Sequence, residues 1–354
     1  MQQPTDLAPR VVTLGTAGGP RWWSSKTGQH RHGIATAVVV GDAYYLVDAG
    51  LGVGRQLERA ELSFNDMRAM FITHLHSDHT VDIPSLLLMG LYARDADKAP
   101  IQLFGPGDRG MLPPVSARAE VEPHPVFPEN PTPGISGMVH SIVQAYATDL
   151  NDRILDALRP SPLDCFAVND IEIPANIGYH PNDNPTPTGM APFEVYRDEL
   201  VTVTAILVEH PPVAPAFAFR FDTVAGSVTI SGDTTATDNL VTLATGTDLL
   251  LHEAIDFDWV EAAYGGGHTD TEQASIDHHR KSHTSPEQAI ELATRAGASR
   301  LALHHLVPGN TPLDRWETLG ATFEGEFFIP HDLDCISFAR QDAEHADQLT
   351  KVGV

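Results

Sequence analysis

The chain has 354 residues, of which 42% are hydrophobic and 19% charged, as is typical of a globular protein with a sizeable core. Asp and Glu outnumber Lys and Arg by 47 to 22, and the formal net charge of −25 argues against a nucleic-acid partner. No apolar run approaches the roughly 20 residues of a membrane-spanning helix, so we expect no membrane partner. The polar segment Met1–Arg10 lacks the features of a signal peptide, and we therefore expect a cytoplasmic location.

The first 80 residues alternate short strand patterns with turn signals. Hydrophobic and β-branched runs predict four strands, at 11–15, 36–40, 44–47 and 70–73. A helix is predicted over 53–62. The last of the four strands leads directly into a cluster of histidines, and this strand–loop–helix order favours an α/β layered fold.

Residues 106–195 differ in character from the segments on either side. Seven prolines fall between Pro113 and Pro133, a helix is predicted over 135–158, and residues 159–195 are again rich in Pro, Asn and Asp. We interpret 106–195 as an insertion with little core of its own, which forms a lid or a wall over the site of a single domain spanning 1–354.

Regular patterns resume after the insertion. Strands are predicted at 200–208, 216–221, 227–230 and 301–303. Between the last two of these, a helix is predicted over 286–296, with Ser285 as N-cap, Gln288 completing a capping box and Gly297 ending the helix.

The strongest chemical signal is the motif His74-Leu75-His76-Ser77-Asp78-His79, with four metal-binding side chains in six residues. In extended backbone, His74 and His76 point the same way, while Asp78 and His79 on the following turn face a second position nearby. Imidazole and carboxylate together suit Zn²⁺, with Mn or Fe as alternatives. The motif therefore predicts the centre of a two-metal site.

Further ligands must come from distant segments. His210 and Asp233 each follow a predicted strand, and His304 and His305 follow the strand at 301–303. A lone histidine at a strand end is more often structural, but the strand ends of an α/β sheet are where such sites assemble. We expect these side chains to converge on the motif, and the residues alone leave the choice between His304 and His305 open.

The motif at 74–79 resembles the metallo-β-lactamase fold superfamily, and other stretches are similar to its ribonuclease Z and arylsulfatase-like branch. These stretches are Leu14–Pro20, Val47–Gly50 with Arg55–Leu57, Ser231–Thr234, Leu251–Ala254, and the segment from His283 to Leu306. The resemblance spans about 11–105 and 200–310. It implies an αββα sandwich of two mixed β-sheets flanked by helices.

The resemblance also implies roles for individual residues. One metal would be held by His74, His76 and His210, and the other by Asp78, His79 and His305, with Asp233 bridging the two. His283 would be the general acid, Glu253 a supporting carboxylate, and Asp78, or the bridging Asp233, would orient the nucleophile. By analogy alone, the family suggests a homodimer.

These features predict a metal-dependent hydrolase in which a hydroxide bridging two metals attacks the substrate. The sequence shows no Lys/Arg-rich arm that could grip RNA, and the chain is acidic. We therefore expect a small-molecule substrate such as a carboxylic ester, lactone, phosphoester or sulfate ester. The alternative is a ribonuclease Z-like phosphodiesterase that processes tRNA 3′ ends. Trp22, Trp23 and Trp259 are candidates for an apolar substrate wall, with ordinary packing an equal alternative.

Two other classes are compatible with the fold that the motif implies. A redox enzyme on this fold would need iron, which metal analysis would detect. A binding protein with a vestigial site is disfavoured by the complete ligand set.

Overall fold

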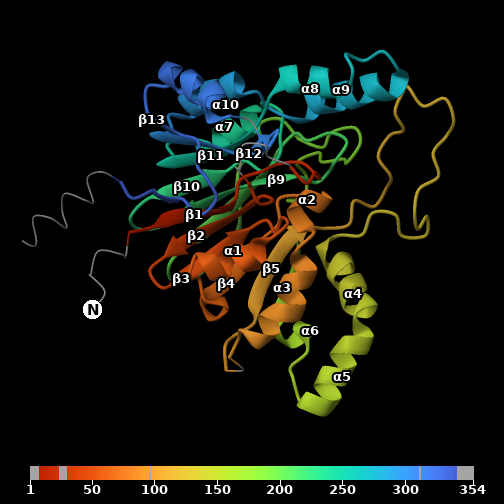
Figure 1. Cartoon of the computed structure of the whole chain (residues 1–354), viewed down its shortest axis with the longest axis vertical. Coiled ribbons are helices and arrows are strands. Elements are labelled where there is room, and N and C mark those ends of the chain that lie inside the picture. The colour runs from red at the N-terminus through yellow and green to blue at the C-terminus, as the bar shows by residue number, and fades with distance from the viewer. Residues whose placement is uncertain (1–7, 24–29, 96, 311, 341–354) are drawn as a thin grey trace, which may run out of the picture.

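Two seven-stranded sheets make up the centre of the computed structural model (Figure 1), which describes residues 8–23, 30–95, 97–310 and 312–340. Sheet A has the strand order β14 (Cys335–Ser337), β1 (Arg10–Gly15), β2 (Ala35–Val40), β3 (Ala43–Val47), β4 (Met67–Phe71), β5 (Ile101–Pro106) and β6 (Phe166–Ile171). Sheet B has the order β13 (Glu326–Phe328), β12 (Arg300–Val307), β11 (Leu249–Ile255), β10 (Ser227–Ile230), β9 (Phe217–Asp222), β8 (Thr202–Leu207) and β7 (Phe193–Arg197). The segment in which we found no signal peptide lies mostly outside the described residues.

Both sheets are mixed. In sheet A the β14–β1–β2–β3 pairs are antiparallel and the β3–β4–β5–β6 pairs parallel. In sheet B the β7–β8–β9–β10 pairs are antiparallel and the β10–β11–β12–β13 pairs parallel. The parallel strands of each sheet need crossover segments, and these supply most of the helices.

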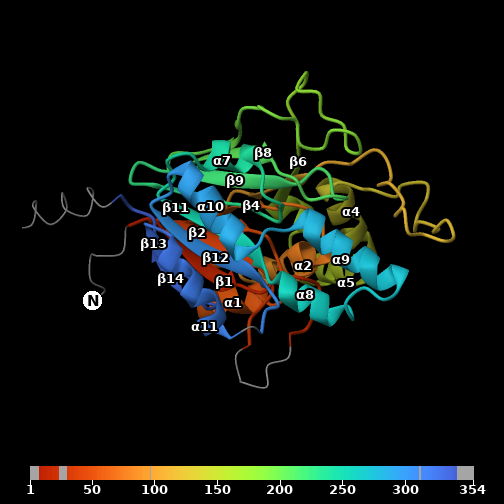
Figure 2. The same ribbon diagram turned by 90° about the horizontal axis from the view of Figure 1, so that it is seen from above.

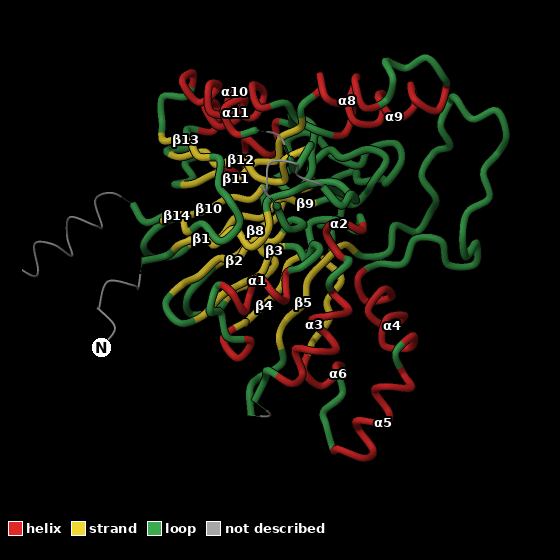
Figure 3. Tube along the Cα trace, viewed as in Figure 1, coloured by secondary structure: helices red, strands yellow, loops and turns green. Residues whose placement is uncertain are grey.

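Helices lie on the outer faces of the sheets (Figure 3). The α-helices are α1 (Val53–Arg59), α2 (Ser77–Thr80), α3 (Ile83–Met89), α4 (Ile135–Ala145), α5 (Ala147–Ala157), α6 (Pro162–Cys165), α7 (Asp238–Ala244), α8 (Phe257–Ala263), α9 (Asp270–Ser282), α10 (Pro286–Ala296) and α11 (Leu313–Glu317). Short 3₁₀ turns span Phe64–Asp66, Gly90–Tyr92 and Thr318–Thr322. None of the helices in the described ranges is long and apolar enough to cross a bilayer.

Three apolar layers hold the sandwich together. The central layer lies between the sheets, where Phe71 of β4 meets Phe219 and Phe221 of β9 at ring-centroid distances of 5.5 Å and 5.4 Å. A second layer joins the outer face of sheet A to α1, α3 and α4, and a third joins the outer face of sheet B to α7, α10 and α11. The predicted αββα sandwich of two mixed sheets flanked by helices is therefore confirmed.

Individual elements differ from their predicted bounds for local reasons. The helix predicted over 286–296 forms as α10, with the Ser285–Gln288 capping box and Gly297 in the left-handed region at φ 66°. The helix predicted over 135–158 is two helices, because the backbone at Tyr146 (φ −101°, ψ 12°) interrupts it. The strand predicted at 301–303 continues through both His304 and His305.

The segment 106–195 adds to the sandwich as well as extending beyond it. Its strands β6 and β7 form one edge of sheet A and one edge of sheet B, and α4 buries Ile135 and Val139 against sheet A. The proline-rich loop before α4 extends beyond the sheets towards α9 (Figure 2), where Arg118 pairs with Asp277 at 2.9 Å. Whether this segment acts as a lid or a wall stays a prediction.

Candidate metal centre

The motif at 74–79 occupies the turn that leaves sheet A at the end of β4. His74 and His76 lie on the loop, and Asp78 and His79 lie on the short helix α2, for which His76 is the N-cap residue. The carboxylate of Asp48, at the end of β3, accepts a hydrogen bond from the Thr73 backbone N–H at 2.8 Å. This bond fixes the start of the loop to the neighbouring strand.

Sheet B supplies the remaining side chains. His210 follows β8, and Asp233 follows β10 directly after Gly232, whose φ of 59° and close approach to the Phe217 carbonyl oxygen leave no room for a Cβ. His305 lies within β12 at φ 48°, opposite a register shift between Glu253 and Ala254 of β11. Such an irregularity rotates a side chain out of the normal alternation of a strand.

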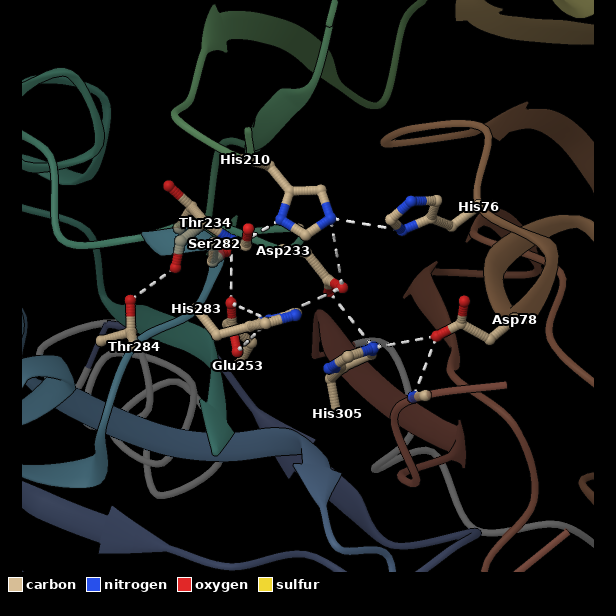
Figure 4. Close-up of polar contacts among 12 residues, drawn as sticks. His76, Asp78, His210, Asp233, Thr234, Glu253, Ser282, His283, Thr284 and His305 are labelled. Atoms are coloured by element: carbon tan, nitrogen blue, oxygen red, sulfur yellow. Dashed lines mark hydrogen bonds and ion pairs between the residues drawn. The ribbon is translucent and has the colours of Figure 1, made fainter. Parts of the chain in front are cut away.

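These segments converge into two groups, each with four ligand atoms within 4.8 Å of one another. The first group is His74, His76, His210 and Asp233, and the second is Asp78, His79, His305 and the same Asp233. Figure 4 shows Asp233 between His210 on one side and His305 and Asp78 on the other. The structure brings together all seven residues of the implied ligand set, with Asp233 common to both groups, and their role as metal ligands stays a prediction.

The distances between the ligand atoms suit a shared cation better than direct hydrogen bonds. Nε2 of His305 lies 3.2 Å from Nε2 of His79, 3.3 Å from Oδ2 of Asp78 and 3.2 Å from Oδ1 of Asp233. Ligands about 2.0–2.1 Å from a tetrahedral Zn²⁺ lie about 3.3 Å apart. Nε2 of His74 and Oδ1 of Asp233 are also buried without a hydrogen-bond partner, as expected for atoms whose partner is a metal ion.

Neighbouring groups fix the tautomers that metal binding requires. Nδ1 of His79 lies 2.8 Å from Oδ2 of Asp48, and Nδ1 of His210 lies 2.8 Å from the Ser282 carbonyl oxygen. Because both oxygens only accept, each Nδ1–H donates, and each Nε2 is left with its lone pair facing the centre.

Burial favours the neutral form of several of these imidazoles. It is the main reason that the pKa of His74 and of His210 lies well below the usual value, and it lowers the pKa of His76 as well. Burial alone would also lower the pKa of His79, but the carboxylates of Asp233 and Asp48 outweigh it and raise that pKa. A bound cation would displace this proton, since only the neutral imidazole binds metal.

His283 and Glu253 lie beside the two groups without belonging to either. Nδ1 of His283 lies 3.0 Å from Oε1 of Glu253, which also accepts a hydrogen bond from the Thr234 backbone N–H at 2.8 Å. Burial lowers the pKa of His283, but the carboxylates of Glu253 and Asp233 outweigh it and raise it to about 9. Because Glu253 holds Nδ1, the Nε2 atom of His283 is the one available to the cavity that this residue lines.

Some neighbours of the centre were not assigned from the sequence. Asp48 occurs in the Val47–Gly50 stretch, but nothing in the residue pattern indicated a contact with His79. His278 and His279 line the cavity beside the metal groups, and the sequence analysis gave them no role. His304 is buried with its Nδ1 unpartnered and belongs to neither ligand group.

A cavity of about 350 Å³ opens onto the two groups. Its lining includes the ligands His76, Asp78, Asp233 and His305 together with His283. A substrate bond placed in this cavity would meet the ligand set and His283 together.

Comparisons with known proteins agree with this architecture. Residues 33–107 match a family described as the anti-Pycsar protein Apyc1, over less than half of the chain. The chain is 29% identical over 297 residues to a protein named ribonuclease Z from Mycobacterium sp. strain KMS, covering 82% of this chain and 85% of the relative.

Solved structures give the same fold. Human tRNase Z, short form, aligns with a TM-score of 0.59 at 19% identity, over 94% of this chain and all of the human chain. The metallo-β-lactamase fold protein YhfI from Bacillus subtilis aligns with a TM-score of 0.57 at 16% identity, over 93% of this chain and 99% of its own. The chain has the metallo-β-lactamase fold. The comparisons confirm the predicted resemblance to ribonuclease Z. They also confirm the general prediction of a metal-dependent hydrolase, without its substrate class.

The prediction of a small-molecule ester, lactone, phosphoester or sulfate ester substrate is wrong, and so is the expectation that nucleic acid is an unlikely partner. The relatives named ribonuclease Z and the tRNase Z structures contradict both. Both predictions relied on the net charge of −25, which counts Asp78 and Asp233 as free anions. Two bound divalent cations would add roughly four positive charges next to these carboxylates, and bound cations dominate the local electric field.

We predict that the purified protein, after loading with Zn²⁺, binds close to two ions per chain, and that Asp233→Ala retains fewer than one. Asp233 is common to both groups, whereas His283 belongs to neither. His283→Ala should therefore retain the wild-type metal content in elemental analysis. Equal metal loss in the two variants would overturn the roles assigned to these residues.

We also predict that Asp48→Asn weakens metal affinity about 10- to 100-fold, as is typical when the partner of a metal-binding histidine is changed. The amide cannot hold the Nδ1–H of His79 as the carboxylate does. Competition with a chelator of known affinity measures the effect. The matched control is Asp42→Asn, an exposed residue of the β2–β3 turn, which should leave the affinity unchanged. An Asp48→Asn protein with wild-type affinity would show that Asp48 does not support the site.

Proposed function

We propose that this chain is a metal-dependent endoribonuclease of the ribonuclease Z type, which hydrolyses a phosphodiester at the 3′ end of precursor tRNA. The single observation that carries the proposal is the similarity to proteins named ribonuclease Z over more than four-fifths of both chains. The two ligand groups that share Asp233 support it, because a pair of metal ions suits the displacement at a phosphodiester.

We propose Zn²⁺ for the two ions, held by His74, His76 and His210 on one side, by Asp78, His79 and His305 on the other, and by Asp233 on both. Nitrogen and carboxylate ligands without cysteine suit Zn²⁺, and Cys165 and Cys335 do not belong to either group. When bound, the two ions would supply a nucleophile at neutral pH and stabilise the charge that develops on the phosphate.

The residues of the chain would perform the remaining steps. Glu253 holds His283 through its Nδ1, so that the opposite nitrogen faces the cavity and can donate a proton to the leaving oxygen. Asp78 is fixed by the Gly19 backbone N–H, which donates to its Oδ2 at 2.9 Å. This bond leaves Oδ1 of Asp78 available to orient the attacking group.

We propose that the segment 106–195 forms a wall beside the site. Arg109 anchors it to the loop that follows His210, where its guanidinium donates to the Pro212 carbonyl oxygen at 2.6 Å. A homodimer and a cytoplasmic location stay predictions that gel filtration and fractionation can test.

We predict that the zinc-loaded protein cleaves a precursor tRNA carrying a 3′ trailer, and that His76→Ala abolishes cleavage. His283→Ala should lower kcat by about 10²- to 10⁴-fold, the usual contribution of general acid catalysis, while the metal content is retained. Gel analysis of end-labelled transcripts measures both effects. Exposed His331→Ala serves as the control, because this side chain lies outside the cavity lining.

The proposal would be refuted if the wild-type protein, with two bound ions, left precursor tRNA intact under conditions where a ribonuclease Z cleaves it. It would also be refuted if the cleavage persisted undiminished in the His76→Ala variant, because the activity would then come from a contaminant.

A further inference from the structure

One arginine and three aromatic rings form a cluster at the mouth of the metal cavity. The guanidinium carbon of Arg21 lies 5.9 Å from the ring centroid of Trp23, 5.4 Å from that of Trp259 and 5.7 Å from that of Tyr264. Arg21 also donates a hydrogen bond to the Tyr264 hydroxyl at 3.1 Å. We refer to Arg21, Trp23, Trp259 and Tyr264 as the Arg21 cluster.

Two distant segments build this cluster. Arg21 and Trp23 lie on the loop after β1, while Trp259 lies on α8 and Tyr264 is the C-cap residue of that helix. The two indole rings meet edge to face at a centroid distance of 5.4 Å. Tyr264 and the two tryptophans pack against the small apolar layer under α8 and α9, which holds the rings in place.

The loop that carries Arg21 is tied directly to the metal ligands. The Gly19 backbone N–H donates to Oδ2 of Asp78, and the indole N–H of Trp23 donates to the Gly18 carbonyl oxygen at 2.7 Å. A Cβ at Gly18 would lie 2.3 Å from the ring of His305, so the backbone approaches the second ligand group as closely as glycine permits. The position of the cluster relative to the metal groups is therefore fixed.

Charge distinguishes the Arg21 cluster from ordinary packing. All four of its side chains line the same cavity as His76, Asp78 and His305, and Arg21 is the one Lys or Arg in that lining among the described residues. Arg21 is exposed and the three rings are partly exposed, so part of the surface of each ring faces the cavity and solvent. In a chain of net charge −25, a permanent cation beside the metal groups is a specific feature.

Aromatic faces combined with an arginine are what single-stranded nucleic acid requires. An unpaired base stacks on an aromatic ring, and a guanidinium contacts the adjacent phosphate. A base-paired stem offers neither an exposed base face nor a single flexible phosphate to so small a cavity. The combination of rings and cation therefore favours an unpaired nucleotide as the occupant.

We propose that the Arg21 cluster is a binding subsite for one unpaired nucleotide adjacent to the cleaved phosphodiester, with the base stacked on Trp259 and the neighbouring phosphate held by Arg21. The proposal rests on the proposed function only for the identity of the larger RNA. The subsite itself makes a separate prediction about small nucleotides.

The test uses cytidine 5′-monophosphate, which contains no phosphodiester to cleave, titrated into the zinc-loaded full-length chain by calorimetry. Trp259→Leu and Arg21→Gln should each raise the dissociation constant by ~5-fold or more, as expected for loss of one stacking or phosphate contact. The control is Val224→Ala, because Val224 is fully exposed between β9 and β10 and lies outside the cavity lining. Its dissociation constant should equal that of the wild type.

Three further measurements make the outcome decisive. Ribose 5-phosphate should bind more weakly than the nucleotide and be insensitive to Trp259→Leu, because it has no base to stack. The metal content and the circular dichroism spectrum of each variant must match those of the wild type. If Trp259→Leu fails this check, the milder Trp259→Phe replaces it and should bind with intermediate affinity. With precursor tRNA, Trp259→Leu should raise KM and leave kcat within about twofold.

Equal affinity for cytidine 5′-monophosphate in the wild type, Trp259→Leu and Arg21→Gln would overturn the subsite. Absence of cleavage of precursor tRNA by the wild type would instead overturn the proposed function. The two failures are distinguishable, because nucleotide binding is measured without any cleavage step.

Discussion

The site depends on one buried carboxylate placed among several imidazoles. Five histidines, His74, His79, His210, His283 and His305, have a ring nitrogen 3.2–4.0 Å from a carboxylate oxygen of Asp233. All of these groups are buried, and the Oδ1 of Asp233 has no hydrogen-bond partner among the described residues. Asp48 and the Ser282 carbonyl oxygen already hold the Nδ1 atoms of His79 and His210, so their Nε2 lone pairs face the centre, where two divalent cations would accept them.

The αββα sandwich creates this arrangement by packing two sheets face to face. The turn after β4 brings four candidate ligands from sheet A, and the ends of β8 and β10 together with the irregular part of β12 bring three from sheet B. The aromatic contacts of Phe71 with β9 fix the two sheets relative to each other directly behind the turn that carries the ligands. The same apolar packing that stabilises the fold therefore sets the distances within the site.

The sequence was most informative where local chemistry decides the structure. The spacing of His74, His76, Asp78 and His79 indicated a ligand cluster, and the capping box at Ser285 located the start of α10 correctly. The break at Tyr146 was not predicted, because the apolar periodicity runs through it and the sequence there has neither Pro nor Gly.

His305 required the resemblance as well as the residue pattern. Strict alternation along β12 would give no reason to prefer it over His304, and only the backbone conformation at φ 48° turns its ring to the second ligand group. Asp48 is similar, since its contact with His79 arises from strand pairing between β3 and β4, which the sequence of either strand does not specify.

The substrate class was the largest error, and its cause is physical. Net charge describes the long-range field of a chain, whereas recognition of RNA next to a metal centre depends on a few groups at short range. We propose that in this protein those groups are two metal ions and the Arg21 cluster, neither of which appears in a sum over 354 residues. Acidity elsewhere on the surface then bears on association rates and salt dependence more than on the chemistry of the site.

X-ray absorption spectroscopy of the zinc-loaded protein tests the central claim most directly, because it reports the ligands and the distance between the ions without any assumption about the substrate. The account predicts a shell of nitrogen and oxygen at about 2.0–2.1 Å with imidazole scattering, and a metal–metal separation of about 3.5–4 Å. A shell containing sulfur, or a single ion with no metal neighbour at full loading, would contradict it.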